Sequence, residues 1–305
     1  MTPGPQSAFA TFGAEAEYLA RLTLWMVGGA VVIAAIVAAL FVVAIRSREG
    51  AIGNRGGRRL LLVAGGIVPT IVLFALLVTT LPAMRPIAAS AGDLRIRVTG
   101  EQFWWRVRYQ PPGDTAVETA NEVRVPVGRT TVFDLAAADV LHSFWIPGLA
   151  GKVDMVPGRT NRLVVRATKA GRYRGQCAEF CGLSHALMAF DVVAMEPVAF
   201  DAWLASRRVP AVAAASPGSA AYDAHGCAAC HRIAGTASVG IIGPDLSHVG
   251  ARLTLGAGIQ PMTRANLIRF VRAAPDVKPG ARMPAYPKMT DADAAAIADM
   301  LMTLK

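Results

Sequence analysis

The sequence predicts a membrane protein of several domains, in which a two-helix transmembrane hairpin precedes an all-β domain and a small all-α domain. Three observations support this class. Hydrophobic residues make up 53% of the 305 residues and charged residues only 17%, which is too apolar for an ordinary soluble protein. From residue 94 onward, short segments alternate between apolar and polar residues. A Cys-x-x-Cys-His motif opens a C-terminal region that carries helix signals.

Residues 1–91 are expected to form an N-terminal segment and the hairpin. Residues 22–45 and 60–84 contain no charged side chain. At about 1.5 Å per residue each run is long enough to cross the roughly 30 Å hydrocarbon core of a bilayer. Gly65, Gly66 and Pro69 interrupt the second run, which a membrane helix tolerates when its neighbours support it. The alternative, a pair of buried core helices, is disfavoured because both runs exceed the usual length of such helices.

The charges around the two runs predict their orientation. The connecting segment carries five arginines against the single acidic residue Glu49, and no Lys or Arg precedes Arg21. The positive-inside rule therefore places this segment in the cytoplasm. Both termini and the domains after Arg85 are then periplasmic, at a bacterial inner membrane. A cleaved signal peptide is disfavoured, because the first run is too long and follows acidic rather than basic residues.

Residues 92–205 are expected to form the all-β domain. Residues 94–98, 122–127 and 161–166 alternate between apolar and polar side chains, and Pro-Gly and Val-Gly turn signals separate such segments. Several short strands separated by such turns, within about one hundred residues, are typical of a β-sandwich or barrel.

A cluster of soft metal ligands lies near the end of this domain. Cys177, Cys181, His185 and Met188 follow one another within twelve residues, and His142 supplies a second imidazole upstream. Thiolate, thioether and imidazole ligands favour copper over magnesium or calcium. Five such groups are too many for one tetrahedral zinc ion and suit two metal ions.

Each ligand also has a simpler interpretation. A cysteine pair outside the cytosol often forms a disulfide, but pairs this close would constrain the unfolded chain very little. His142 alone is more typical of a hydrogen-bonded histidine at a strand edge, and Met188 alone of a core residue. The compact spacing of the whole cluster favours the metal site.

The C-terminal region, residues 220–305, follows a linker at 206–219 that is rich in Ala, Pro and Ser. Cys227-Ala-Ala-Cys230-His231 has the spacing of covalent haem attachment, in which the thiols add to the haem vinyl groups and the histidine binds iron. A thioredoxin-like redox pair is disfavoured by the adjacent histidine and the lack of a βαβ pattern. Thr263 and Thr290 are expected to cap helices that reach Ala274 and Leu304.

The copper cluster resembles the binuclear copper (CuA) motif of cytochrome c oxidase subunit II, as do residues 139–147 and 152–158 and the preceding hairpin. The resemblance covers roughly residues 15–205 and implies a cupredoxin-like domain. It also implies that two cysteines bridge two coppers, while two histidines, a methionine and one backbone carbonyl complete the site. By position these are Cys177 and Cys181, His142 and His185, Met188, and the carbonyl of Glu179. The family also uses this glutamate's carboxylate towards a magnesium ion at the boundary with the catalytic subunit.

The C-terminal region resembles a small class I cytochrome c domain over residues 217–305. The resemblance implies His231 and a methionine as axial ligands of the haem iron. Met283 matches that methionine best, with Met289 and Met262 as rivals. His248 is expected not to bind iron. The carbonyl of Pro244 is a candidate for orienting His231.

Phe103, Trp104 and Trp105 resemble the aromatic stretch through which electrons enter the copper site of this family. The family usually has tryptophan where Phe103 stands, so the electron path here departs from the usual one. The alternative is a packed aromatic cluster with no redox role.

Together the domains resemble subunit II of caa-type haem–copper oxidases, which carries its own cytochrome c. This implies an oxidoreductase subunit that takes electrons from a donor, such as a cytochrome c or a cytochrome bc complex. It would pass them from haem to copper and on to a haem–copper catalytic subunit, which reduces oxygen to water beside other oxidase subunits. No catalytic residues are expected in this chain, since five histidines cannot also build the oxygen site.

Three alternatives differ in the metal site or the partner. A quinol oxidase subunit II shares the fold but lacks the copper ligands. The copper-bearing small subunit of a nitric oxide reductase would differ in its partner chain. A standalone membrane-tethered electron carrier would have no catalytic partner chain. The net charge of +10 includes no basic stripe with interleaved aromatic residues, so nucleic-acid binding is not expected.

Overall fold

The computed structural model of the chain describes residues 6–48, 53–84, 87–111, 116–211 and 216–305. The chain divides into two compact units. One consists of residues 17–87 and holds the helical hairpin, while the other consists of residues 1–16 and 88–305 and holds the β domain and the C-terminal helices.

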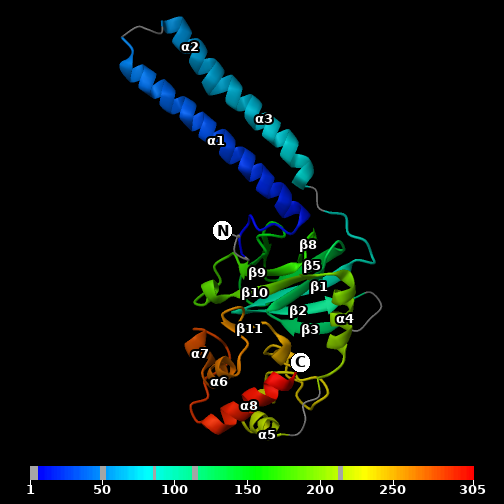
Figure 1. Cartoon of the computed structure of the whole chain (residues 1–305). Coiled ribbons are helices and arrows are strands. Elements are labelled where there is room, and N and C mark those ends of the chain that lie inside the picture. Colours follow the sequence, from blue (N-terminus) through cyan, green and yellow to red (C-terminus); the bar gives the residue numbers. More distant parts are fainter. Residues whose placement is uncertain (1–5, 49–52, 85–86, 112–115, 212–215) are drawn as a thin grey trace. The chain divides into compact units, whose positions relative to one another are not determined.

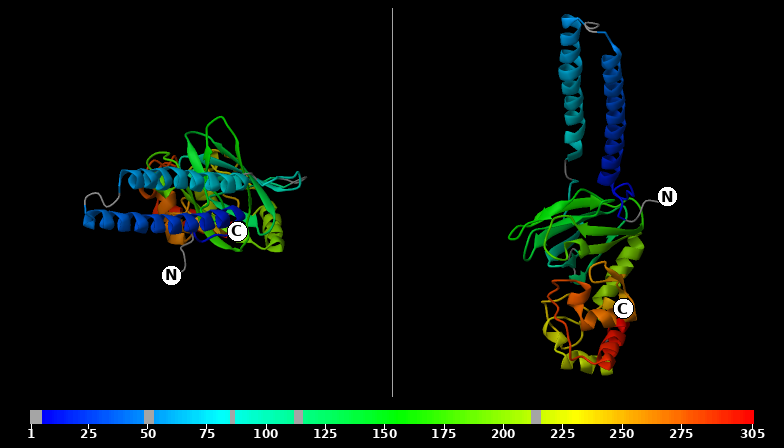
Figure 2. Two further views of the ribbon diagram at one scale, coloured as in Figure 1. Left: turned by 90° about the horizontal axis from the view of Figure 1, so that it is seen from above. Right: turned by 90° about the vertical axis from the view of Figure 1, so that its left-hand side faces the viewer.

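Two long helical segments lie side by side in the hairpin (Figures 1 and 2). The first is α1 (Ala14–Arg46), and the second runs through α2 (Asn54–Leu62), the π-helical turn η1 (Val63–Ile67), α3 (Val68–Thr80) and the 3-10 turn η2 (Leu81–Met84). The π turn contains Gly65 and Gly66, where the sequence predicted an interruption. Both segments are long and apolar enough to cross a membrane, and their apolar side chains point outward: Trp25 is 81% exposed.

The β domain is a sandwich of two five-stranded sheets, which confirms the predicted all-β class (Figure 1). The first sheet has the order β3 (Val117–Ala120), β2 (Trp104–Gln110), β1 (Leu94–Glu101), β5 (Thr130–Ala137) and β8 (Asn161–Arg166). The second has the order β4 (Glu122–Pro126), β10 (Ala189–Met195), β9 (Gly171–Cys177), β6 (His142–Trp145) and β7 (Val153–Met155). Each sheet has one parallel pair, β1 with β5 and β10 with β4. Helix α4 (Pro197–Arg208) follows the second sheet.

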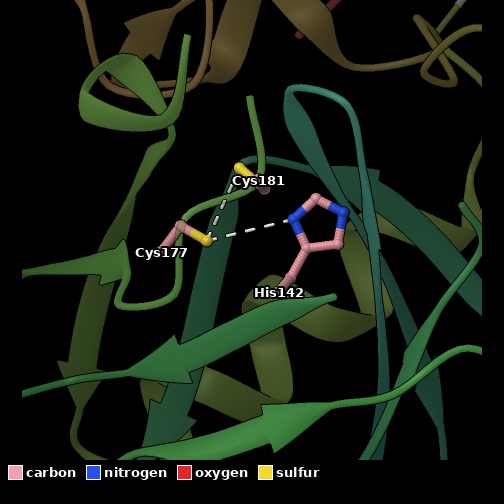
Figure 3. Close-up of side chains that lie close together, drawn as sticks. All are labelled: His142, Cys177 and Cys181. Atoms are coloured by element: carbon pink, nitrogen blue, oxygen red, sulfur yellow. Dashed lines mark hydrogen bonds between the residues drawn. The ribbon is translucent and has the colours of Figure 1, made fainter. Parts of the chain in front are cut away.

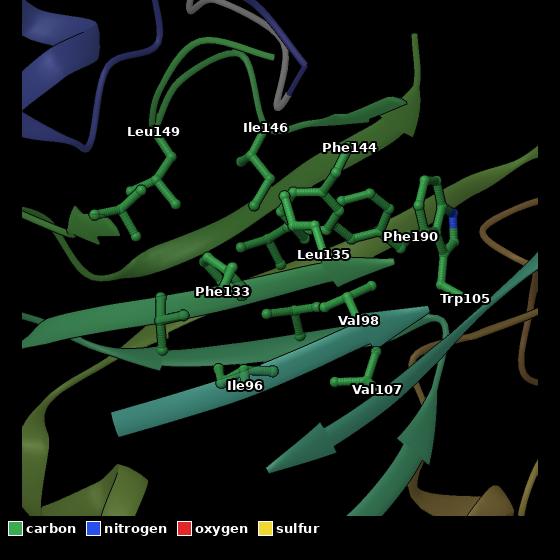
Figure 4. Close-up of a cluster of buried hydrophobic side chains, with 14 of the residues drawn as sticks. Ile96, Val98, Trp105, Val107, Phe133, Leu135, Phe144, Ile146, Leu149 and Phe190 are labelled. Carbon is green, nitrogen blue, oxygen red and sulfur yellow. The ribbon is translucent and has the colours of Figure 1, made fainter. Parts of the chain in front are cut away.

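The core lies between the sheets, because alternate side chains of each strand point inward. On β1, Leu94, Ile96 and Val98 are buried, while the arginines between them are more exposed. An aromatic cluster from three strands fills the centre (Figure 4). The ring centroids of Trp105 and Phe190 are 5.2 Å apart, and those of Phe144 and Phe190 are 4.9 Å apart.

The C-terminal region is mainly helical, with α5 (Pro217–Ala224), α6 (Arg264–Arg272), α7 (Ala274–Val277) and α8 (Asp291–Thr303), and the short 3-10 turns η4 (Cys227–Ala229) and η5 (Val249–Ala251). The Thr263 and Thr290 side chains cap α6 and α8 as predicted. Helix α6 ends two residues before the predicted Ala274, because Ala273 leaves helical dihedral angles. Helix α8 packs against α5 and α6 around Leu267, Ile297 and Leu301.

A small antiparallel hairpin in this region was not predicted. Strands β11 (Thr254–Leu255) and β12 (Gln260–Pro261) pair across a turn that contains Ala257, which has a left-handed φ of 67°. Each strand is only two residues long, too short for an alternating pattern to reveal it. The other regular elements of the region are helical, as the sequence predicted.

Phe190 of β10 packs closely against Gly175 of β9, and this contact gives a stability prediction. A Cβ atom added at Gly175 would lie 2.1 Å from Cζ of Phe190, so Gly175→Ala forces the aromatic cluster apart. We expect a loss of about 1–3 kcal/mol in the free energy of unfolding, which is typical of overpacking. Thermal unfolding of the purified chain measures it. The matched control is Gly151→Ala, because no heavy atom lies within 4 Å of a Cβ there. Equal melting temperatures for both variants would contradict the prediction.

Candidate functional site

Two chain segments meet at one end of the sandwich and bring the predicted copper ligands together. His142 begins β6, and Cys177 ends β9, the strand beside it. The loop after Cys177 then folds back through the 3-10 turn η3 (His185–Leu187) and joins β10. Figure 3 shows His142, Cys177 and Cys181 turned towards one another. All three are buried, and their ligand atoms lie within 4.8 Å of one another.

Every predicted copper ligand has an atom within 4 Å of one of the two cysteine sulfurs. Sγ of Cys177 lies 3.9 Å from Sγ of Cys181 and 3.9 Å from Nδ1 of His142. Sγ of Cys181 lies 3.7 Å from Nδ1 of His185 and 3.8 Å from Sδ of Met188. The carbonyl oxygen of Glu179 lies 3.2 Å from Sγ of Cys177. The cysteines are not joined in a disulfide, so both sulfurs remain available to a metal.

Asp139 fixes the orientation of the His142 ring. Nε2 of His142 lies 2.9 Å from Oδ1 of Asp139, which leaves Nδ1 facing the thiols. A carboxylate that holds the outer nitrogen of a ligand histidine is typical of metal sites. Burial disfavours the charged imidazole, but hydrogen bonds to Cys177 and Asp139 outweigh burial and raise the pKa of His142.

Asp139 is itself held by two backbone groups. The N–H groups of Gln102 and Val140 each donate to its carboxylate at 2.8 Å. Burial opposes ionisation, yet these bonds and the contact with His142 lower the pKa of Asp139. Asp139 had no predicted role of its own. Its position three residues before His142 was the only available signal.

The two thiols are not equivalent before a metal binds. A hydrogen bond with Cys181 lowers the pKa of Cys177, and the same contact raises the pKa of Cys181. The thiolate is the form that binds metals, so the lowered pKa favours Cys177 as a metal ligand. Two thiols, two imidazoles and a thioether, each within 4 Å of at least one other member of the set, are donors that suit copper.

Glu179 presents its two oxygen types in different directions. Its backbone carbonyl faces Cys177, while its carboxylate is 39% exposed and lies 3.5 Å from Nζ of Lys152. One residue can therefore contribute to the copper centre and to a surface beside it.

A cavity in the C-terminal region is lined by the predicted haem-binding residues. Cys227, Cys230, His231 and Met283 all face it, beside apolar side chains such as Leu246 and Leu301. Such a mainly apolar cleft with two thiols and an imidazole fits a haem group. A partly buried arginine adds to the fit. Arg252 lines the cavity, and its buried Nε has no hydrogen-bond partner among the residues that the structure describes, so it offers a donor to a haem propionate.

The ring of His231 is oriented by a backbone carbonyl, as predicted. Its Nδ1–H donates to the carbonyl oxygen of Pro244 at 2.8 Å, which leaves Nε2 free to bind iron. Burial lowers the pKa of His231, and the neutral imidazole is the form that binds a metal.

The three candidate methionines lie in different surroundings. Met283 and Met262 line the cavity, whereas Met289 is 2% exposed within the helical core. Met283 therefore remains the best match to an iron ligand, with Met262 as the rival in the cavity. The ring of His248 points elsewhere, with Nε2 3.0 Å from the carbonyl oxygen of Val209.

The aromatic stretch lies between the two sites. Phe103 and Trp104 line the same cavity as Cys230 and His231. Trp105 points into the sandwich core instead, with its ring centroid 6.2 Å from that of His142. Trp105 is therefore a core residue, whereas its two neighbours face the cavity, and the redox role of the stretch stays a prediction.

Comparisons with known proteins agree with this layout. Residues 111–195 match the family model of the cytochrome c oxidase subunit II periplasmic domain, and residues 215–305 match that of cytochrome c. Cytochrome c oxidase subunit 2 of Alkalihalophilus pseudofirmus is 38% identical over 250 residues, covering 78% of this chain and 71% of that protein. The protein of the same name from Bacillus subtilis is 30% identical over 253 residues, covering 78% and 70%.

A solved structure is also similar to part of the chain. The periplasmic domain of subunit II of cytochrome oxidase from Bradyrhizobium japonicum is 31% identical, with a TM-score of 0.37. The match covers 40% of this chain and 97% of that one.

Replacing a bridging thiol should remove copper and leave haem in place. We expect Cys177→Ser to lower bound copper from about two ions per chain to below one, because the Cys177 thiolate, a predicted copper ligand, is lost. Metal analysis and the haem absorbance of the purified chain measure both cofactors. Cys230→Ser is the reciprocal control, which should disturb haem attachment and retain copper. Full copper occupancy in Cys177→Ser would refute the ligand assignment.

Methionine-to-leucine variants should identify the second iron ligand. Leucine keeps the volume but lacks the sulfur, so folding is little affected. We expect Met283→Leu to abolish the absorption band of a methionine-bound ferric haem, and Met289→Leu and Met262→Leu to retain it. Loss of the band in Met262→Leu or Met289→Leu alone would transfer the assignment to that residue.

Proposed function

The chain belongs to the family of cytochrome c oxidase subunit II, and on that premise we propose the route by which it passes electrons to an oxygen-reducing partner. Family membership and the cytochrome c domain make it an electron-transfer subunit of a haem–copper oxidase. When bound, haem c and the copper pair supply two successive one-electron carriers between an external donor and the catalytic subunit, where oxygen is reduced to water.

The residues around the haem cavity and the copper centre have distinct tasks. Cys227 and Cys230 would hold the haem, and His231, oriented by the carbonyl of Pro244, would bind its iron. Cys177, Cys181, His142 and His185 would hold the copper pair, and Asp139 orients the ring of His142.

One observation carries the proposed route: Phe103 and Trp104 line the haem cavity while their neighbours contact the copper ligands. The N–H of Gln102 bonds to Asp139, and its side-chain amide donates to the carbonyl of Cys181 at 2.6 Å. The aromatic stretch therefore connects the haem cavity with both copper-ligand segments. Phe103 stands where the family usually has tryptophan, and Trp104 supplies an indole at the cavity wall.

We extend the proposal to the surroundings of the chain. The helical hairpin anchors it in a bacterial inner membrane, with both termini and the soluble domains in the periplasm. The catalytic subunit docks beside the copper centre with other oxidase subunits, and the exposed carboxylate of Glu179 binds magnesium at that boundary. A cytochrome c or a cytochrome bc complex supplies the electrons.

Copurification followed by oxygen uptake tests the function. We expect the tagged chain to isolate a complex with a haem–copper subunit that consumes oxygen when the chain's own haem is reduced. A complex that reduces nitric oxide instead, or a chain that isolates without a haem–copper partner, would overturn the oxidase function. Both outcomes are measurable with the same preparation.

Substitution of Trp104 tests the route. We expect Trp104→Leu to slow transfer from haem to copper by about tenfold or more, because an aromatic group that faces the cavity is lost. Trp104→Phe keeps an aromatic ring and should recover part of the rate. Flash photoreduction of the haem, followed by absorbance, measures the rate in samples with equal haem and copper content. Parental transfer in Trp104→Leu would exclude this route.

A further inference from the structure

The segment that carries Met283 lies directly against the copper-ligand loop. The Ser184 hydroxyl, fully buried, donates to the carbonyl of Pro279 at 2.6 Å. A Cβ atom added at Gly280 would lie 3.0 Å from Cε2 of Phe103, and one added at Gly182 would lie 3.1 Å from Cζ of the same ring. Phe103 is thus enclosed between the copper-ligand loop and residues 278–283, which we call the methionine loop.

Lys278 makes a second buried polar contact between these loops. Its side chain is 3% exposed, and Nζ donates to the carbonyl of Leu187 at 3.0 Å and of Gly256 at 2.7 Å. Leu187 lies between the predicted ligands His185 and Met188, whereas Gly256 belongs to the β11–β12 turn. Burial lowers the pKa of Lys278 to about 7, but the neutral amine also carries the two hydrogens that these bonds need.

Arg282 reaches the other ligand-bearing segment. Its Nη2 lies 3.0 Å from Oδ2 of Asp139, the carboxylate that orients His142. Asp139 is only 12% exposed, while Arg282 is 57% exposed. The methionine loop therefore contacts both segments that supply copper ligands, one through Lys278 and the other through Arg282.

The β11–β12 hairpin holds the same two domains together from a second side. The N–H of Ala189, next to Met188, donates to the carbonyl of Ala257 at 3.0 Å. Arg174 donates to the carbonyl of Gly258 at 2.8 Å, and the N–H of Leu253 donates to Glu122 at 3.0 Å. The haem domain is thus joined to the β domain by a second set of hydrogen bonds, which does not involve the methionine loop.

We propose that Lys278 and Arg282 are positioning residues, which fasten the methionine loop to the two copper-ligand segments so that docking of the haem domain sets the arrangement of the copper ligands. The proposal rests on the proposed function, because it concerns the same pair of redox sites. It goes beyond that function in making the copper site responsive to residues of the haem domain that bind no metal.

The test uses the full chain loaded with haem and copper. We expect Lys278→Met to increase amide hydrogen exchange in residues 184–190 by about tenfold, since it removes a buried donor to Leu187. It should also change the electron paramagnetic resonance spectrum of the copper and slow transfer from haem to copper. Arg282→Met should shift the same spectrum less, because its contact is more exposed, and Arg282→Lys should restore the parental spectrum.

The matched control is Lys288→Met, which removes an exposed lysine of the same domain and should leave all three readouts unchanged. Arg282→Met covers the case in which Lys278→Met fails to fold, as judged by haem and copper content. Parental exchange and spectra in the folded variants would overturn the positioning role. Failure of haem-to-copper transfer in the parental chain would instead refute the proposed function, while exchange and spectra would still decide the role of Lys278 and Arg282.

Discussion

The copper site depends on one constraint: two loops that are distant in sequence must bring their soft ligands into contact at the end of the sandwich. Asp139 contributes much to holding these loops together. Its carboxylate accepts hydrogen bonds from two backbone groups and orients His142, and it also contacts Arg282 of the haem domain. A largely buried carboxylate is stable only with such partners, so the surrounding loops are ordered together with it.

Burial and hydrogen bonding favour the metal-binding protonation state of two ligands, Cys177 and His231, before any cofactor binds. The contact between the thiols favours a Cys177 thiolate, and burial favours a neutral His231. At each site a hydrogen bond also fixes the orientation of a histidine ring. Asp139 orients His142 at the copper site, and the carbonyl of Pro244 orients His231 at the haem site. The metal-binding ring nitrogens therefore face their sites, and a metal would bind to groups that are already oriented.

The boundary between the β domain and the haem domain contains buried polar groups whose hydrogen bonds reach across it. Lys278 and Glu122 are each nearly buried, and each has one hydrogen-bond partner across the boundary. Such groups are costly to bury without partners, so they favour one docked arrangement over many loose ones. The linker keeps the domains near each other, while these contacts select how they meet.

The sequence by itself determined the fold class, the strands of β1, β4 and β8, the helix caps at Thr263 and Thr290, and which residues are candidate ligands. These features depend on local periodicity and on spacing within one segment, so they are visible along the chain. Only the tertiary structure decided that Asp139 orients His142, that Met289 lies in the core while Met283 faces the cavity, and that Lys278 reaches Leu187. Each of these depends on groups far apart in sequence that meet through packing, and no local pattern encodes such a meeting.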